Sequence, residues 1–361
     1  MKTVGRVAVA SSAGLGWLAV VWSIAVPGLR GHTAPGVLGD SVPVPRRTVL
    51  VYAGGAHRRH YSVNDLTDVV AAVDTAGRPV GWFCEGAILL ELQATSGRNY
   101  YPLPGVPAQG QDWNAYLDSL FGKGGVLPTL DSAVAAVMAK LGPAPGGFRV
   151  ALMIPYPAQI ADTVWVGKRP FVTAGESGRR SVVEAYVDEV ERRFAAARFA
   201  NLRLLAYYWL NEGIRSDDTL LVHQASAIVH QRGRGFLWIP SFDAPGYSSW
   251  RQLGFDFAWL QPNYFFHTDL PATRIDTALS HARTQGMGIE IEFDTRMFMD
   301  WRFADRLAPY LSALGSAEAE DMRARPIAIY AGDVALMRLA RSTDPWQRAL
   351  YARLVSILCL P

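Results

Sequence analysis

The sequence has very little cysteine and little charge for its length. Only Cys84 and Cys359 occur in 361 residues, which excludes a disulfide-stapled mini-fold and any metal site built from a cysteine cluster. A disulfide between these two outside the cell stays an alternative. Charged residues make up 19% of the chain and the formal net charge is +3, with the arginines scattered along the sequence. This balance lacks the electrostatic footprint of nucleic-acid binding, so we expect no nucleic-acid partner.

Motifs for several common chemistries are also missing. The stretch GYSSW at 246–250 lacks the second glycine of a serine-hydrolase elbow, and no glycine-rich phosphate loop follows a strand at the required spacing. The pairs His57/His60 and His267/Asp269 fall in predicted loops, and no zinc-binding helix motif accompanies them. We therefore expect no metal and no cofactor.

The first thirty residues carry the pattern of an export segment. Two basic residues precede an uncharged stretch at 7–26 that is long enough to span a bilayer. Residues 1–30 are therefore predicted to be a signal peptide or a membrane anchor. Ser23 and Ala25 supply the small residues that cleavage by a signal peptidase requires. Residues 31–47 are rich in proline and glycine and are predicted to be a linker. We expect the protein to be secreted, or anchored in the membrane facing the extracellular side.

Residues 48–361 are predicted to form one α/β domain. Short β-branched or aromatic runs alternate with amphipathic stretches, which is typical of a parallel sheet wrapped by helices. Eight strands are expected, over or within 48–54, 79–91, 148–157, 202–213, 235–242, 255–266, 287–294 and 325–332. Eight strands, each followed by a helix, are the count of a (β/α)8 TIM barrel. An open doubly wound sheet is the alternative.

Local signals place several helices and loops. Ser62 with Asp65 predicts a helix over 63–75, and Ser181 with Glu184 predicts a helix that begins there. Residues 98–113 are predicted to be a polar loop. Further helices are expected over 129–141, from 217, over 273–285, over 303–314 and from 345.

Acidic residues stand at the carboxyl ends of two predicted strands, where TIM barrels hold their active sites. The fourth strand ends in Asn211-Glu212. On the seventh, Glu290, Glu292 and Asp294 alternate and therefore point to one face. Three carboxylates facing a barrel lumen are costly without partners or a task, although an exposed strand edge would permit the same alternation.

A carboxylate after the fourth strand, paired with another on the seventh, suits glycoside hydrolysis. One acid protonates the departing oxygen, while the other, ionised, attacks the anomeric carbon or activates water. We therefore predict Glu212 and Glu292 as the catalytic pair, with Glu290 as the rival partner of Glu212 and Asp294 as a supporting residue.

Aromatic and amide side chains near the same strand ends are candidate substrate-binding residues. Flat apolar sugar faces stack on aromatic rings, and sugar hydroxyls exchange hydrogen bonds with neighbouring polar groups. For Trp259, inside the sixth strand, core filling is the favoured interpretation. The candidate substrate-binding set is Tyr52, Trp209, Asn211, Trp238, Gln261, Asn263, Tyr264, Glu290 and Asp294.

Motifs spread over the barrel region resemble a known family. The segments are VLVYAG (49–54), DW-x-x-YLDSLF (112–121), IPYP (154–157), YYWLNE (207–212), LWIPSFDAPGYSSW (237–250), GFDFAWLQPNYFF (254–266) and GMGIEIEFD (286–294). Together they resemble the bacterial domain-of-unknown-function family 4855, and the Gln-Pro-Asn-Tyr and Glu-x-Glu-Phe-Asp stretches are the most specific. The resemblance implies a glycoside-hydrolase-like barrel, without an established substrate.

The strand-end acids also resemble those of clan A retaining glycosidases. This likeness implies that Asn211 binds the sugar 2-hydroxyl, Glu212 is the general acid/base and Glu292 is the nucleophile. Two positions depart from the expected patterns: Glu85 stands where an aspartate of Phe-Asp-Gly is expected, and the eighth strand ends in Tyr330-Ala331-Gly332, without the tryptophan of clan A.

Two functions of different class follow. The first is an exported glycoside hydrolase acting on a polysaccharide or oligosaccharide of the cell envelope or extracellular space, by a retaining double displacement. The alternative is a non-catalytic barrel that binds polysaccharide.

Overall fold

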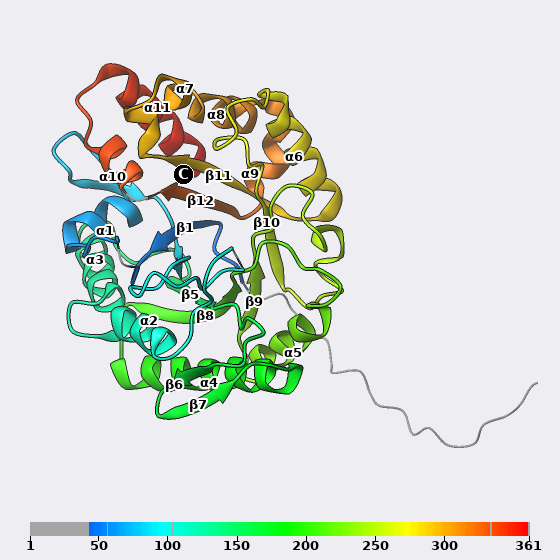
Figure 1. The fold of residues 1–361 in the computed structure, drawn as a ribbon. Helices are drawn as coiled ribbons and strands as arrows, with labels where there is room; N and C mark the ends of the chain where they lie inside the picture. The colour runs from blue at the N-terminus through cyan, green and yellow to red at the C-terminus, as the bar shows by residue number, and fades with distance from the viewer. Residues whose placement is uncertain (1–42, 56, 103, 333, 360–361) are drawn as a thin grey trace, which may run out of the picture. The chain divides into compact units, whose positions relative to one another are not determined.

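Eight apolar runs form the strands of a closed parallel barrel, which helices surround (Figure 1). In chain order the strands are β1 (Arg47–Tyr52), β4 (Gly86–Leu90), β5 (Phe148–Ile154), β8 (Leu202–Trp209), β9 (Gly235–Trp238), β10 (Phe257–Leu260), β11 (Gly288–Asp294) and β12 (Ile327–Gly332). Each pairs in parallel with the next, and β12 closes on β1. The computed structural model describes residues 43–359 apart from 56, 103 and 333. The TIM barrel is confirmed and the open sheet is excluded, while the predicted export segment and most of the linker lie outside the described residues.

The helices and two hairpins complete the fold. The helices are α1 (Val63–Val70), α2 (Asp112–Phe121), α3 (Val126–Leu141), α4 (Glu176–Ala197), α5 (Thr219–His230), α6 (Thr273–Gln285), α7 (Trp301–Ala304), α8 (Leu307–Gly315), α9 (Glu320–Ala324), α10 (Ala335–Ala340) and α11 (Pro345–Leu358). The hairpins are β2 (Ala71–Val73) with β3 (Pro79–Trp82), and β6 (Thr163–Val166) with β7 (Arg169–Val172).

Several predicted element ends were wrong because tertiary pairing overrides local signals. The Ser62/Asp65 capping box is present, but its helix ends at Val70, since the next three residues pair with β3. Helix α4 begins at Glu176, so Ser181 lies inside it. The predicted loop over 98–113 gives way to α2 at Asp112.

The stretch Asp112–Leu141 is long and apolar enough to cross a membrane by length and composition. It consists of two helices, α2 and α3, which pack against β6, β3 and α1. We therefore interpret it as core helices of the barrel domain.

The alternative of a disulfide between Cys84 and Cys359 is not realised in this structure, because both cysteines are free thiols. Cys359 Sγ instead donates to the carbonyl oxygen of Trp82, two residues before Cys84, at 3.1 Å.

Strand register decides which side chains share a face of the barrel wall. Glu292 lies opposite Tyr330, Tyr330 opposite Leu50, and Leu50 opposite Ile88. Paired residues on neighbouring strands point to the same side of a sheet, and positions two apart on one strand do so as well. Glu290 and Glu292 therefore share the face of Leu50 and Ile88.

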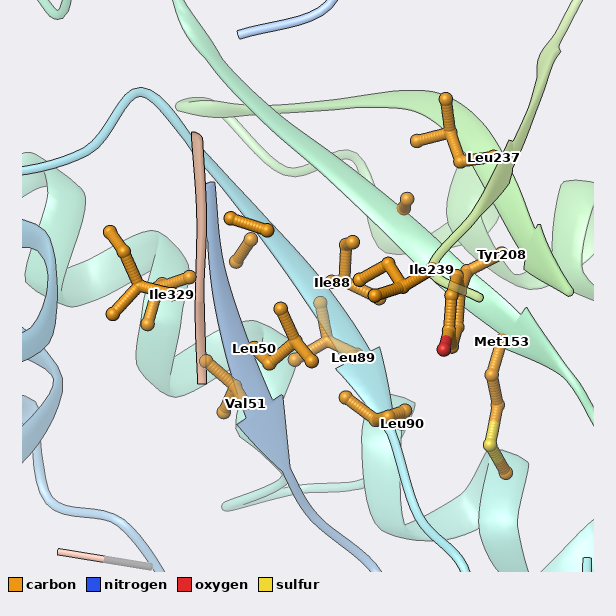
Figure 2. Close-up of a cluster of buried hydrophobic side chains, with 14 of the residues drawn as sticks. Leu50, Val51, Ile88, Leu89, Leu90, Met153, Tyr208, Leu237, Ile239 and Ile329 are labelled. Carbon is orange, nitrogen blue, oxygen red and sulfur yellow. The ribbon is translucent and has the colours of Figure 1, made fainter. Parts of the chain in front are cut away.

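That shared face is the barrel lumen. Residues of the opposite parity, Val51 and Ala331, line a narrow space with Val69 of α1 and Leu336 of α10, on the helix side. Ile88 belongs to the buried apolar cluster of Figure 2, in which side chains from several strands gather. The alternation along β11 thus carries two glutamates into the lumen.

Arg47 fastens the first strand to the last part of the chain. Its buried guanidinium donates to the carbonyl oxygens of Arg46 at 2.7 Å, Arg323 at 3.0 Å and Arg325 at 3.3 Å. It also lies 3.5 Å from the carbonyl oxygen of Ile357 in α11. Burial lowers the pKa of Arg47 to about 10, so the group stays charged at neutral pH.

We expect Arg47→Gln to lower the free energy of unfolding by about 2 to 4 kcal/mol, because buried carbonyls lose a charged donor. Urea unfolding followed by circular dichroism measures the change. Arg203→Gln, at an exposed position of β8, is the matched control and should change stability by less than about 0.5 kcal/mol. Equal losses in the two variants would contradict a special role for Arg47.

Candidate active site

The glutamates of β11 lie in the lumen with almost no contact with solvent. The exposed fraction is 2% for Glu290 and 0% for Glu292. The Tyr310 hydroxyl of α8 donates to Glu292 Oε2 at 2.6 Å. Burial raises the pKa of Glu292 to about 8, although this hydrogen bond and the backbone amides of Asn263 and Tyr264 act to lower it. Within the described chain Oε1 has no hydrogen bond of regular geometry.

Glu290 has a different environment from its neighbour. Among the residues that the structure describes, none donates a hydrogen bond to its Oε1. Burial raises the pKa of Glu290 well above its usual range, and the charges of Glu292 and Glu212 raise it further. Glu290 is therefore the strand-seven acid that keeps its proton, and Glu292 is the one whose ionised form has donors.

Glu212 follows β8 and is partly exposed at the lumen. Ser241 Oγ, beyond the end of β9, donates to Glu212 Oε2 at 2.5 Å. Burial raises the pKa of Glu212, and hydrogen bonds from Ser241 and Gln261 oppose the shift. A carboxyl group with a raised pKa can hold a proton at neutral pH and donate it to a substrate.

Tyrosines surround these acids. Tyr52 of β1 packs edge-on against Tyr330 of β12, with ring centroids 5.5 Å apart. Burial raises the pKa of both Tyr52 and Tyr208 well above the usual range, and the charges of Glu212 and Glu290 raise both further. Their hydroxyls therefore remain protonated and can donate hydrogen bonds into the lumen.

The predicted residues Gln261 and Asn263 lie at the site, where their side chains hydrogen-bond the loops after β9 and β10. Gln261 Nε2 donates to the carbonyl oxygen of Ile239 at 3.1 Å, and its Oε1 accepts from Asn263 Nδ2 at 3.0 Å. Asn263 Oδ1 accepts from the amide of Phe242 at 2.7 Å. Asn263 has φ 52°, a left-handed conformation that asparagine tolerates better than most residues. The two amides thus fix the loop whose backbone faces Glu292.

The prediction that Trp209 and Trp238 stack on sugar was wrong. Their exposed fractions are 1% and 0%, and both belong to the packed core. Trp238 stacks on Phe255 with ring centroids 5.0 Å apart, and its Nε1 donates to the carbonyl oxygen of Asn211 at 2.8 Å. Strand alternation places Tyr208 in the lumen, so Trp209 next to it points to the helix side. Trp259 is buried too, as the core interpretation predicted.

Three more residues of the predicted substrate-binding set, Asn211, Tyr264 and Asp294, are buried or contact other side chains of the protein. Asn211 is buried behind the end of β8. The ring of Tyr264 lies under the Arg306 guanidinium, 3.7 Å from its centroid, and Arg306 also donates to the Tyr264 carbonyl oxygen. Both oxygens of Asp294 accept from the Arg296 guanidinium, Oδ1 at 3.1 Å and Oδ2 at 2.7 Å. Asp294 therefore braces the turn after β11.

An ion pair beside the site was not predicted from the sequence. Glu91 follows β4 and is buried, and its Oε2 accepts from Arg58 Nε at 2.7 Å. The Arg58 guanidinium also lies over the Tyr52 ring, 4.7 Å from its centroid. Ser241, Tyr208, Tyr310 and Tyr330 were not predicted as site residues either. Aromatic residues lie on both faces of β8, so no local pattern singles out Tyr208.

The structure thus brings together Glu212, Glu290, Glu292, Tyr52 and Gln261 of the predicted set. Burial raises the pKa of all three carboxyl groups, that of Glu292 to about 8, and both Glu212 and Glu292 have hydrogen-bond donors inside a lumen lined by tyrosines. Such a site can donate a proton and hold a negative charge at separate atoms.

Comparisons with known proteins concern the family and the fold. The family model described as Domain of unknown function (DUF4855) matches residues 47–356. No curated protein matches the chain significantly.

Solved structures show distant similarity. A mutant tryptophan synthase α-subunit from the hyperthermophile Pyrococcus furiosus has 11% identity and a TM-score of 0.39, covering 87% of this chain and 97% of that chain. A chain from work on the pneumococcal virulence factor StrH and N-glycan recognition and hydrolysis has 12% identity and a TM-score of 0.41, covering 88% and 83%.

We expect Glu290→Gln to stabilise the fold increasingly as the pH rises. The unfolded chain releases its proton near the ordinary glutamate pKa, whereas the folded protein holds it to higher pH. Folding with the parental residue is therefore favoured at low pH, and this contribution is lost as the pH rises through the folded pKa. Glutamine does not titrate, so the variant should gain about 1 kcal/mol or more at pH 8 relative to pH 5.

Urea unfolding at both pH values measures this gain. Glu176→Gln, at the exposed start of α4, is the matched control and should show no such trend. A gain that is the same at pH 5 and pH 8 would show that Glu290 does not carry a raised pKa.

Proposed function

The chain belongs to the DUF4855 family of domains of unknown function, and we propose that its barrel is a glycoside hydrolase. The observation that carries the proposal is the pairing of Glu212 with Glu292 at the lumen of a closed (β/α)8 barrel. The two acids come from the fourth and seventh barrel strands. Burial raises the pKa of both, that of Glu292 to about 8, and each has hydrogen-bond donors that support its ionised form: Ser241 and Gln261 for Glu212, and Tyr310 for Glu292.

Glu212 is proposed as the general acid/base. It is the acid with partial exposure, so a glycosidic oxygen can reach it. Burial raises its pKa, which favours the protonated form before the reaction. Ser241 donates to its Oε2 at 2.5 Å, and Gln261 also hydrogen-bonds the carboxyl group, so the acid is held in place for the substrate.

Glu292 is proposed as the nucleophile of a retaining double displacement. In the first step Glu212 gives its proton to the glycosidic oxygen, the bond from that oxygen to the anomeric carbon breaks, and Glu292 bonds to that carbon. In the second step Glu212 takes a proton from water, and the water oxygen displaces Glu292. Glu290 stays protonated in the lumen and limits the negative charge beside the nucleophile.

The substrate class we propose is a polysaccharide or oligosaccharide of the cell envelope or extracellular space. The lumen offers hydrogen-bonding tyrosine hydroxyls, and the Arg58 guanidinium lies over the Tyr52 ring beside it; such groups suit a polyhydroxylated ligand. We also propose that the protein is exported, either secreted or anchored through residues 7–26. The basic residues ahead of that uncharged stretch support this location.

A non-catalytic polysaccharide-binding barrel is the second candidate. The complete burial of Glu292 favours it, because a nucleophile must touch the anomeric carbon. Catalysis therefore requires that substrate binding opens the contact between Glu292 and the loop at Asn263 and Tyr264. Turnover measurements on variants separate the two candidates.

We expect Glu212→Gln and Glu292→Gln each to lower kcat by about a hundredfold or more while polysaccharide binding is kept, because each removes one required proton-transfer or bond-forming group. The measurement is reducing-end release from the polysaccharide that the parent cleaves. Glu176→Gln is the control. Unchanged turnover in both active-site variants would remove these residues from the mechanism.

The product formed with azide assigns the roles, using an aryl glycoside of the same sugar. Azide should replace the missing carboxylate in Glu292→Gly and give a glycosyl azide of inverted configuration. In Glu212→Gly the configuration should be retained. Inversion by Glu290→Gly in place of Glu292→Gly would transfer the nucleophile role to Glu290.

We expect Tyr310→Phe to lower kcat about tenfold and to move the acidic limb of the kcat/KM pH profile to higher pH. The variant removes a donor to the Glu292 carboxylate, so the pKa of Glu292 rises further and the ionised form appears later. Tyr186→Phe is the control, because the buried Tyr186 hydroxyl has no partner among the described residues. An unshifted acidic limb would contradict the proposed link between Tyr310 and catalysis.

A further inference from the structure

One large aromatic side chain, on the connection that follows β11, is almost fully exposed. Trp301 is 86% exposed, the highest value among the exposed large apolar side chains of the described residues, and Met299 is 69% exposed. Both lie in the connection between β11 and α8, which leaves the carboxyl end of the strand that carries Glu290 and Glu292. This end of a (β/α)8 barrel holds the substrate.

The connection is braced on both sides of Met299. Asp294 accepts from the amide of Arg296 at 2.8 Å, and Asp300 accepts from the amide of Arg302 at 3.0 Å. In each pair the arginine guanidinium also donates to the same aspartate, Arg296 to Asp294 at 2.7 Å and Arg302 to Asp300 at 2.6 Å. The exposed indole therefore sits on a fixed arm, so little entropy is lost when it binds a ligand.

Ring contacts connect this arm to the candidate active site. Tyr52 contacts Tyr330 and Tyr330 contacts Phe266, each with centroids 5.5 Å apart. The Arg296 guanidinium lies over Phe266 at 5.1 Å and over Phe303, a residue of α7, at 4.5 Å. A continuous series of contacts thus runs from the tyrosines beside Glu290 to the helix that presents Trp301.

We propose that Trp301 is a stacking platform for a sugar unit several residues away from the cleaved bond, and that the substrate is therefore a polymer whose chain crosses this rim. The inference rests on the proposed function. A single flat ring flanked by Asp300 and Arg302 fits a sugar, whose apolar face stacks while its hydroxyls meet the charged groups. A second protein would bury a broader apolar surface than one ring and one methionine provide.

Trp301→Ala is the test variant, and its high exposure means that folding should be unaffected. We expect KM for the polysaccharide to rise about tenfold, the effect of losing about 1.4 kcal/mol of stacking, while kcat/KM for an aryl glycoside of the same sugar stays unchanged. Trp346→Ala is the matched control, since Trp346 is 52% exposed at the start of α11, and it should change neither constant.

Other outcomes would overturn the inference. Unchanged KM for the polysaccharide, or equal losses on both substrates, would remove the platform role. A monomer produced by Trp301→Ala from a parental dimer in sedimentation velocity would assign the ring to self-association.

If the parent cleaves no member of a panel of purified envelope and extracellular polysaccharides, affinity gel electrophoresis on the same panel decides. Binding by the parent that Trp301→Ala weakens would keep the platform and overturn only the hydrolase. Binding that the variant leaves unchanged, or no binding by the parent, would overturn the platform as well.

Discussion

The repulsion between two buried carboxyl groups on one strand face governs this site. Glu290 and Glu292 are two residues apart on β11, so the pleat directs both side chains into the same lumen, where both are buried. The repulsion is smaller when one of the two acids keeps its proton, and the hydrogen-bond donors lie at the other acid, Glu292. Glu292 has the Tyr310 hydroxyl, while Glu290 keeps its proton, and the lumen holds less negative charge than its composition suggests.

That asymmetry depends on groups well outside the lumen. The backbone amides near Glu292 belong to the loop after β10, where Asn263 adopts a left-handed conformation and bonds both to Gln261 and to the start of the loop after β9. Arg306 binds the carbonyl oxygens of Tyr264 and Phe265 on the other side of the loop. The protonation of the candidate site is therefore tied to contacts between consecutive strand-helix loops.

The sequence was sufficient for the barrel but only partly sufficient for the site. All eight strands could be predicted, because strands buried on both faces leave apolar runs that few other structures produce. Glu290 and Glu292 could be predicted from alternation alone. Trp209 could not be separated from Tyr208, because β8 carries aromatic residues on both faces and only the register with β5 and β9 decides their direction. Tyr310 and Ser241 reach their partners across 18 and 29 residues, which no local pattern encodes.

The position of Arg47 has a consequence for how the chain is made. Its acceptors lie at residues 323, 325 and 357, and β1 has β12 as one of its two neighbours. During synthesis the first strand therefore keeps one open edge, and Arg47 lacks these acceptors, until residues 323–357 have left the ribosome. The barrel can close only after β12 has been made, so the contacts that close it are among the most distant in sequence and are expected to form late in folding.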